Sequence, residues 1–227
     1  MATAKQKRIA KLVDLYQANM HLFKLFQEGV SNALRFDPTL NHDPHPIIHS
    51  IKTRLKDPSH LAEKIARKEL SGKEITEATL FTDITDLSGV RILHLHQAQA
   101  VQIHEFIIRR VTDKEWHLVE KPVAYSWDPD ATEFFQNLGL KVKIKPSHYT
   151  SILYVVRPKK GAQATCEIQV RTLFEEIWGE IDHTVNYPKP ATNIATTEQL
   201  RVLSKLVSAG SRLADSVFKL HVPELPK

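Results

Sequence analysis

The sequence has one cysteine in 227 residues, and it has no long hydrophobic run, no internal repeat and no low-complexity segment. A single cysteine excludes an internal disulfide, and Cys166, inside a strand-like segment, is more typical of a small buried side chain than of a nucleophile. No segment reaches the length that spans a bilayer, and the N-terminal MATAKQKRIAK has no apolar stretch followed by a small-residue cleavage site. We therefore expect a soluble, cytoplasmic protein that does not act at a membrane.

The charge balance is mildly basic. Lys and Arg number 31 against 26 Asp and Glu, which leaves a net charge of +5. This excess favours ligands that carry phosphate, but it is also common on solvated surfaces, so it only weakly indicates nucleic acid and fits nucleotides equally well. The length and the apolar fraction are compatible with one domain that has a substantial core and helical appendages.

Amphipathic patterns predict a helix at each end of the chain. Apolar residues at helical spacing predict a helix from Ala4 to about Glu28, closed by Gly29. Three prolines between residues 35 and 46 then predict a loop. A second pattern from about Thr197 to Leu220 predicts a terminal helix before a frayed PELPK end, and this helix would dock on the domain or on a second subunit.

The segments between these helices alternate between strand and helix patterns. Residues Ile47 to Lys56 predict a strand, after which Asp57 would cap a helix that begins at Pro58 and ends near Leu70. Further strands are predicted at 90–95, 116–121 and 140–145, helices at 97–110 and 131–138, and a loop at 125–130. The first strand-to-helix junction gathers polar side chains that suit a phosphate, although a solvated basic face would look the same: Arg54, Lys56, Ser59 and Lys64.

The stretch from His148 to Tyr187 predicts two neighbouring strands, HYTSILYVV and CEIQVRT, joined by a turn at RPKKG and followed by a helix. In the second strand Glu167, Gln169 and Arg171 project from one face because strand side chains alternate. Taken alone, this pattern would predict only a half-exposed amphipathic strand.

Two carboxylates far apart in the sequence have similar surroundings. Asp86 and Glu167 each lie beside a strand that carries an arginine, Arg91 and Arg171 respectively. Magnesium that binds together with nucleotide phosphates typically uses only one or two protein carboxylates, so this pair is sufficient in number. The sequence alone does not tell whether the two groups meet.

Four motifs in order resemble the synthetase domain of the RelA/SpoT family, in particular the small single-domain alarmone synthetases, over residues 47–187. They are TRLKDPSHLAEK, DLSGVRI, HYTSILYVV and CEIQVRTLFEEIWGEIDHTVNY, and the last is the most specific. The resemblance implies an α+β fold, a nucleotidyltransferase-like mixed sheet flanked by helices, with helical extensions at both ends. Together with the length and the terminal helix patterns, it predicts one domain over 1–227, with an N-terminal helix and loop at 1–46, a catalytic core at 47–187 and a C-terminal helix at 188–227.

The family resemblance implies transfer of pyrophosphate from ATP to the ribose 3′-hydroxyl of GDP or GTP, which makes (p)ppGpp, with Mg²⁺ as cofactor. Arg54 and Arg91 would sandwich the adenine of ATP, since planar guanidinium groups stack on rings. Three further residues would hold its phosphates: Lys56, Ser59 and Lys64.

The same resemblance implies roles at the reacting groups. Asp86 would bind magnesium, and Glu167 would either accept the proton of the attacking hydroxyl or complete the metal site. Gln169 and Arg171 would orient phosphate oxygens, and Tyr149 would stack on the acceptor base. The remaining acceptor-binding candidates are His148, Ser151 and His183.

Three departures from the family pattern fall in the acceptor strand. The family's Gly is replaced here by His148, its Lys or Arg by Thr150, and its His by Leu153. The acceptor therefore stays open between a guanine nucleotide and, in a toxin-like relative with an antitoxin partner, an adenine nucleotide or the 3′ end of tRNA. A third reading is a non-catalytic nucleotide- or RNA-binding module, against which the acidic pair argues. A homo-oligomer is possible on the terminal helices.

Overall fold

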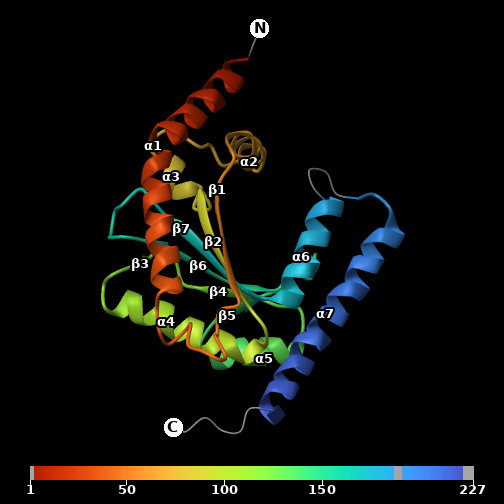
Figure 1. The fold of residues 1–227 in the computed structure, drawn as a ribbon. Helices are drawn as coiled ribbons and strands as arrows, with labels where there is room; N and C mark the ends of the chain where they lie inside the picture. The colour runs from red at the N-terminus through yellow and green to blue at the C-terminus, as the bar shows by residue number, and fades with distance from the viewer. Residues whose placement is uncertain (1–2, 187–190, 222–227) are drawn as a thin grey trace.

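The computed structural model describes residues 3–186 and 191–221 (Figure 1). In this part of the chain seven strands form one mixed sheet in the order β1-β2-β7-β6-β4-β5, with β3 paired to β6. β2 is parallel to β7 and β4 to β5, whereas the other pairs are antiparallel. The strands are β1 (Ser50–Leu55), β2 (Ser88–His94), β3 (His117–Leu118), β4 (Val123–Tyr125), β5 (Lys141–Lys143), β6 (Ser151–Arg157) and β7 (Cys166–Thr172).

Helices flank this sheet on both sides. α1 and α4 pack against one face, and α6 lies on the other side of the sheet with α7 alongside it (Figure 1). The predicted mixed sheet flanked by helices, with helical extensions at both ends, is therefore confirmed. The helices are α1 (Ala4–Arg35), α2 (Pro58–Leu70), α3 (Leu80–Asp83), the 3-10 turn η1 (Gln97–Gln99), α4 (Ala100–Thr112), α5 (Pro129–Asn137), α6 (Leu173–Asn186) and α7 (Ile194–His221).

The two faces of the central strands differ in chemistry. Val90, Ile168 and Tyr154 share one face and are buried in the main core, which also takes side chains from α1 and α4. Alternation directs the neighbours of Val90 and Ile168 to the opposite face, which is polar in β2 and β7, whereas in β6 the neighbours of Tyr154 are apolar. A second apolar cluster joins the N-terminal half of α1 to α2 and α3, and the Tyr16 hydroxyl donates there to the backbone oxygen of Lys56 at 2.9 Å.

The helix predicted to end at Gly29 continues to Arg35, so that prediction is wrong. A glycine inside a helix costs about 1 kcal/mol relative to alanine. Val30 and Leu34, which follow it, are fully buried in the main core. Each such burial contributes about 1.5–3 kcal/mol, which outweighs the local penalty.

The C-terminal helix packs on this chain's own α6, through buried residues that include Leu200 and Val207. The sequence left open whether this helix docks on its own domain or on a second subunit, and the structure shows it on its own domain. The predicted boundary between residues 187 and 188 and the predicted frayed PELPK end lie outside the described residues. No helix in the described ranges combines the length and the apolar character that crossing a bilayer requires.

Candidate active site

The polar face of the sheet carries rows of side chains from neighbouring strands. One row joins Arg54, Gly89 and Glu167, because β1, β2 and β7 pair in this register. The next row joins Lys52, Arg91 and Gln169. Gly89 lies between Arg54 and Glu167, and a Cβ there would be in ordinary van der Waals contact, 3.8 Å from the Arg54 Cγ.

These rows form the floor of a cavity of about 540 Å³, and α6 forms a wall. The lining includes most of the predicted site: Arg54, Asp86, Arg91, Tyr149, Glu167, Gln169, Arg171 and His183. Residues separated by more than a hundred positions in the sequence therefore meet at one place. In particular, the two carboxylates Asp86 and Glu167 line the same cavity.

Asp86 is held as an anion by two lysines. Its Oδ2 lies 2.8 Å from the Lys56 Nζ and 2.7 Å from the Lys64 Nζ. Burial by itself would raise the pKa of Asp86, but the ammonium groups of Lys64 and Lys56 outweigh it and lower this pKa to about 2. Burial also lowers the pKa of Lys56, an effect that the nearby Asp86 partly offsets.

The second oxygen of this carboxylate fits a magnesium ion. The Asp86 Oδ1 is buried and makes no hydrogen bond within the described residues. An anionic oxygen without a partner is the donor that Mg²⁺ prefers, with phosphate oxygens and water completing its shell. The described residues hold no cluster of three or more His, Cys, Asp or Glu side chains that could bind a metal ion. Asp86 is the first candidate ligand for the ion, and Glu167, which lines the same cavity, is the second.

Glu167, Gln169 and Arg171 form a hydrogen-bonded chain along β7. The Gln169 Nε2 donates to the Glu167 Oε1 at 2.7 Å, and the Gln169 Oε1 accepts from the Arg171 Nη2 at 2.8 Å. Gln169 thus orients a carboxylate on one side and a guanidinium on the other. The Arg171 Nε is buried and makes no hydrogen bond in the described part of the chain.

Glu176 on α6 binds three cations of the polar face and was not predicted from the sequence. Its carboxylate lies 2.8 Å from the Lys52 Nζ, 2.8 Å from the Arg91 Nη1 and 3.2 Å from the Arg171 Nη1. Burial would raise the pKa of Glu176, but hydrogen bonds from Lys52 and Arg91 outweigh it and lower this pKa. The available signal was Glu176 and Glu180 at i, i+4 spacing, directly after a strand that bears arginine.

Local sequence explains why α6 approaches so closely. The Glu175 carboxylate accepts from the backbone N of Thr172 at 2.7 Å, and the Thr172 hydroxyl accepts from the backbone N of Glu175 at 3.2 Å, which forms a capping box. Gly179, one turn later, faces Arg171, and a Cβ there would lie 2.7 Å from the Arg171 Nη1. A larger residue at 179 would therefore require the guanidinium to shift from its position.

Tyr149 is held by cations on both sides. Its hydroxyl accepts from the Arg171 Nη2 at 2.9 Å, and the Lys145 Nζ lies 4.2 Å from the centre of its ring. The same ammonium lies 4.1 Å from the Tyr125 ring. Burial lowers the pKa of Lys145, with Glu167 acting in the opposite direction. The ring of Tyr149 is thereby fixed at the cavity wall.

The other predicted residues lie at the margin of this cavity or outside it. Ser59 is exposed at the start of α2, where its hydroxyl donates to the capping residue Asp57. Ser151 is buried in the sheet, and its hydroxyl donates to the backbone oxygen of Val170 at 3.2 Å. His148 faces α7 and is not brought to the cavity.

The chain is similar to known proteins over most of its length. The family described as "Region found in RelA / SpoT proteins" matches residues 53–192. GTP pyrophosphokinase YjbM of Bacillus subtilis is 26% identical over 207 residues, which cover 91% of this chain and 85% of that protein.

Solved structures share the fold. The small alarmone synthetase 1 from Bacillus subtilis bound to its product pppGpp has a TM-score of 0.69 at 22% identity, covering 92% of this chain and 100% of that chain. The same synthetase bound to AMPCPP has a TM-score of 0.61 at 18% identity, covering 92% of this chain and 98% of that chain.

Proposed function

Because the chain belongs to the family defined by the region found in RelA and SpoT proteins, we propose that it is an ATP-dependent pyrophosphokinase that converts GDP or GTP to ppGpp or pppGpp. The observation that carries this proposal is the shared cavity of Asp86 and Glu167, surrounded by arginine and lysine. The naming of a 26% identical relative as a GTP pyrophosphokinase supports it, as does the pppGpp bound by a synthetase of the same fold. We place the reaction in the cytoplasm.

The donor half of the site is the junction of β1, α2 and the start of β2. Lys56 and Lys64, with Ser59 at the start of α2, would bind the phosphates of ATP beside the carboxylate of Asp86. Arg54 and Arg91 would hold the adenine between their guanidinium planes. Arg91 is held by Glu176 at 2.8 Å, so its stacking depends on that carboxylate.

Mg²⁺ held by Asp86 would neutralise phosphate charge, which leaves Glu167 as the base. The chemical step then needs positioning and a proton acceptor. The 3′-oxygen of the acceptor forms a bond to the β-phosphorus of ATP, the bond from that phosphorus to the α,β-bridging oxygen breaks, and AMP leaves. The hydroxyl proton passes to the carboxylate of Glu167, which Gln169 orients through its 2.7 Å hydrogen bond.

The acceptor half of the site is centred on Tyr149. Its ring would stack on the guanine base, while Arg171, with an unpartnered buried Nε in the described structure, would bind acceptor phosphate. His183 lines the same cavity and would contact the acceptor. His148 and Ser151 would act on the acceptor indirectly, by holding the loop and the start of the strand on either side of Tyr149.

The test is product identification. The purified protein is incubated with ATP, Mg²⁺ and, separately, GDP, GTP, AMP, ADP or tRNA, with an ATP-only reaction in parallel, and products are identified by mass spectrometry. We expect ppGpp and pppGpp. Transfer to an adenine nucleotide or to tRNA instead would replace the guanine acceptor, and transfer to none of them would reject the enzyme.

A further inference from the structure

His148 has an unusual backbone conformation directly before the cavity residue Tyr149. Its φ is 60°, in the left-handed region. Glycine occupies this region freely, and histidine is one of the few other residues that enter it. A side chain that persists in such a conformation needs contacts that offset the strain.

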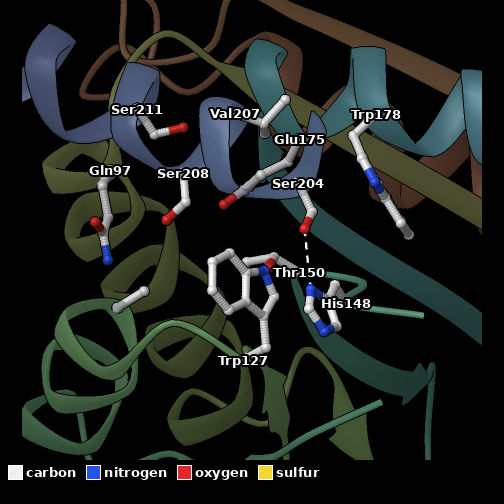
Figure 2. Close-up of a pocket in the computed structure, with 11 residues that line it drawn as sticks. Gln97, Trp127, His148, Thr150, Glu175, Trp178, Ser204, Val207, Ser208 and Ser211 are labelled. Atoms are coloured by element: carbon white, nitrogen blue, oxygen red, sulfur yellow. Dashed lines mark hydrogen bonds between the residues drawn. The ribbon is translucent and has the colours of Figure 1, made fainter. Parts of the chain in front are cut away.

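The side chain of His148 makes two such contacts. Its ring stacks on Trp127, with centroids 4.8 Å apart and an interplanar angle of 18°. Its Nδ1 lies 3.0 Å from the Ser204 Oγ of α7, shown as the dashed line in Figure 2. The Ser204 hydroxyl donates its own proton to the Arg201 oxygen at 2.8 Å, so its oxygen accepts from His148, whose proton is then on Nδ1.

The space around these contacts is almost filled. Trp127 and His148 face Ser204 and Val207 of α7 across a cavity of about 10 Å³ (Figure 2). A cavity of that size holds about one water molecule and leaves no room for a nucleotide. The contacts of His148 are therefore packing between the chain's own segments.

The backbone continues from this anchored residue into the wall of the main cavity. The His148 N donates to the Lys145 oxygen at 3.0 Å, which closes a turn. Two residues of this loop line the main cavity: Lys145, at the start of the turn, and Tyr149, directly after its end. A change of φ at 148 would redirect Tyr149, because it follows at the next Cα.

We propose that His148 is a positioning residue for the acceptor. By tying the loop of residues 145–150 to Trp127 and to Ser204 of α7, it holds the left-handed backbone that turns Tyr149 into the cavity. The C-terminal helix thereby becomes part of the acceptor site without touching the acceptor. The kinetic consequence rests on the proposed function, whereas the structural consequence does not.

The kinetic experiment compares His148→Gly with a matched control, Lys114→Gly. Lys114, with φ of 62°, is the other non-glycine residue at positive φ among the described residues, and it lies between α4 and β3, away from the cavity. Glycine at 148 keeps the backbone freedom but removes the stack and the hydrogen bond. We expect the KM for GDP to rise about tenfold, with the KM for ATP within about twofold of wild type.

Two variants refine this result. Ser204→Ala removes one contact and should raise the KM for GDP about threefold. His148→Asn tolerates the same backbone and retains an N–H donor, so its KM should lie between those of wild type and His148→Gly. Lys114→Gly should change neither KM. An unchanged KM for GDP in His148→Gly, or an equal rise in both KM values, would overturn the proposal.

Hydrogen exchange of the amides in residues 145–150, measured without nucleotide, tests the same idea independently of turnover. Faster exchange there in His148→Gly, but not in Lys114→Gly, is the expected result, and unchanged exchange would overturn the positioning role. If the wild type transfers pyrophosphate to no acceptor, the proposed function fails, and the exchange data still decide the role of His148.

Discussion

The donor and acceptor halves of the cavity are held in different ways. The donor half lies on β1, α2 and the segment before β2, where Asp57 caps α2 and two lysines bind Asp86, 32 positions after Arg54. Its Arg91 is held from further away, by Glu176 of α6. The acceptor half combines the loop before β6, the strand β7 and two C-terminal helices. Short-range structure therefore prepares phosphate binding, whereas long-range side-chain contacts position the acceptor, and the second arrangement is easier to alter by mutation.

The largest expected effect falls on the chemistry that the two halves share. Glu167→Gln removes the proton acceptor, and we expect kcat to fall by about 10²–10⁴-fold. Steady-state kinetics with GDP check this, and Glu115→Gln, at an exposed pair with Arg110, is the control. Wild-type kcat in Glu167→Gln would remove the assignment of Glu167 as base.

Asp86→Asn tests the donor half alone. The substitution removes the anion that binds two lysines and offers Mg²⁺ a neutral ligand, so kcat/KM for ATP should fall by about 100-fold or more, with a raised Mg²⁺ requirement. Magnesium titrations of the rate measure both effects. Asp83→Asn, which removes a carboxylate paired with Lys73 at 2.6 Å outside the cavity lining, should leave them unchanged. Equal losses in the two variants would argue against a metal at Asp86.

Glu176→Gln tests whether α6 holds the cations of both halves in place. The Glu176 side chain is 7% exposed and pairs with three cations, so its loss should lower the free energy of unfolding by about 3 kcal/mol. Glu180 is 59% exposed and pairs with Arg91, so Glu180→Gln should cost less than about 1 kcal/mol. Urea unfolding compares the two, and similar values would show that Glu176 does not organise these cations.

The pH dependence of stability tests the ion pairs of the donor half. The pKa of Asp86 is about 2 in the folded protein against 3.8 ordinarily. As the pH falls, the unfolded state therefore takes up this proton at a higher pH than the folded state does. Its stabilisation is complete above about pH 5 and is lost as the pH falls through 3.8 toward 2, a loss of about 2 kcal/mol. Urea unfolding at several pH values in this window should show that the advantage of wild type over Asp86→Asn disappears. A constant difference would contradict the ion pairs.

Elements with strong local signals were predictable. Asp57 and Pro58 define the start of α2, which begins at Pro58 and ends at Leu70 as predicted. The alternation in Cys166–Thr172 predicted the strand and its two faces, and Ile168 and Val170 are indeed buried. In both cases the pattern lies within a few residues, so no distant contact was needed.

Elements that depend on distant contacts were missed. The strand β4 has only three residues, Val123–Tyr125, and is defined by pairing with β5 and β6. Nothing in the local sequence distinguishes Glu176 from other helical glutamates, because its ion pairs form only when α6 packs over the polar face. The sequence showed His148 only as a departure from the family's Gly, whereas its left-handed backbone and its contact with α7 are seen only in the structure.

The sequence by itself determined the family, the alternating faces of the strands and the residue types that the chemistry needs, because each is written in short motifs. Only the tertiary structure decided that Asp86 and Glu167 line one cavity, that Glu176 joins three cations, and that α7 supports the loop before β6. The physical reason is that strand pairing and helix packing bring together groups whose separation along the chain carries no information about their distance in space.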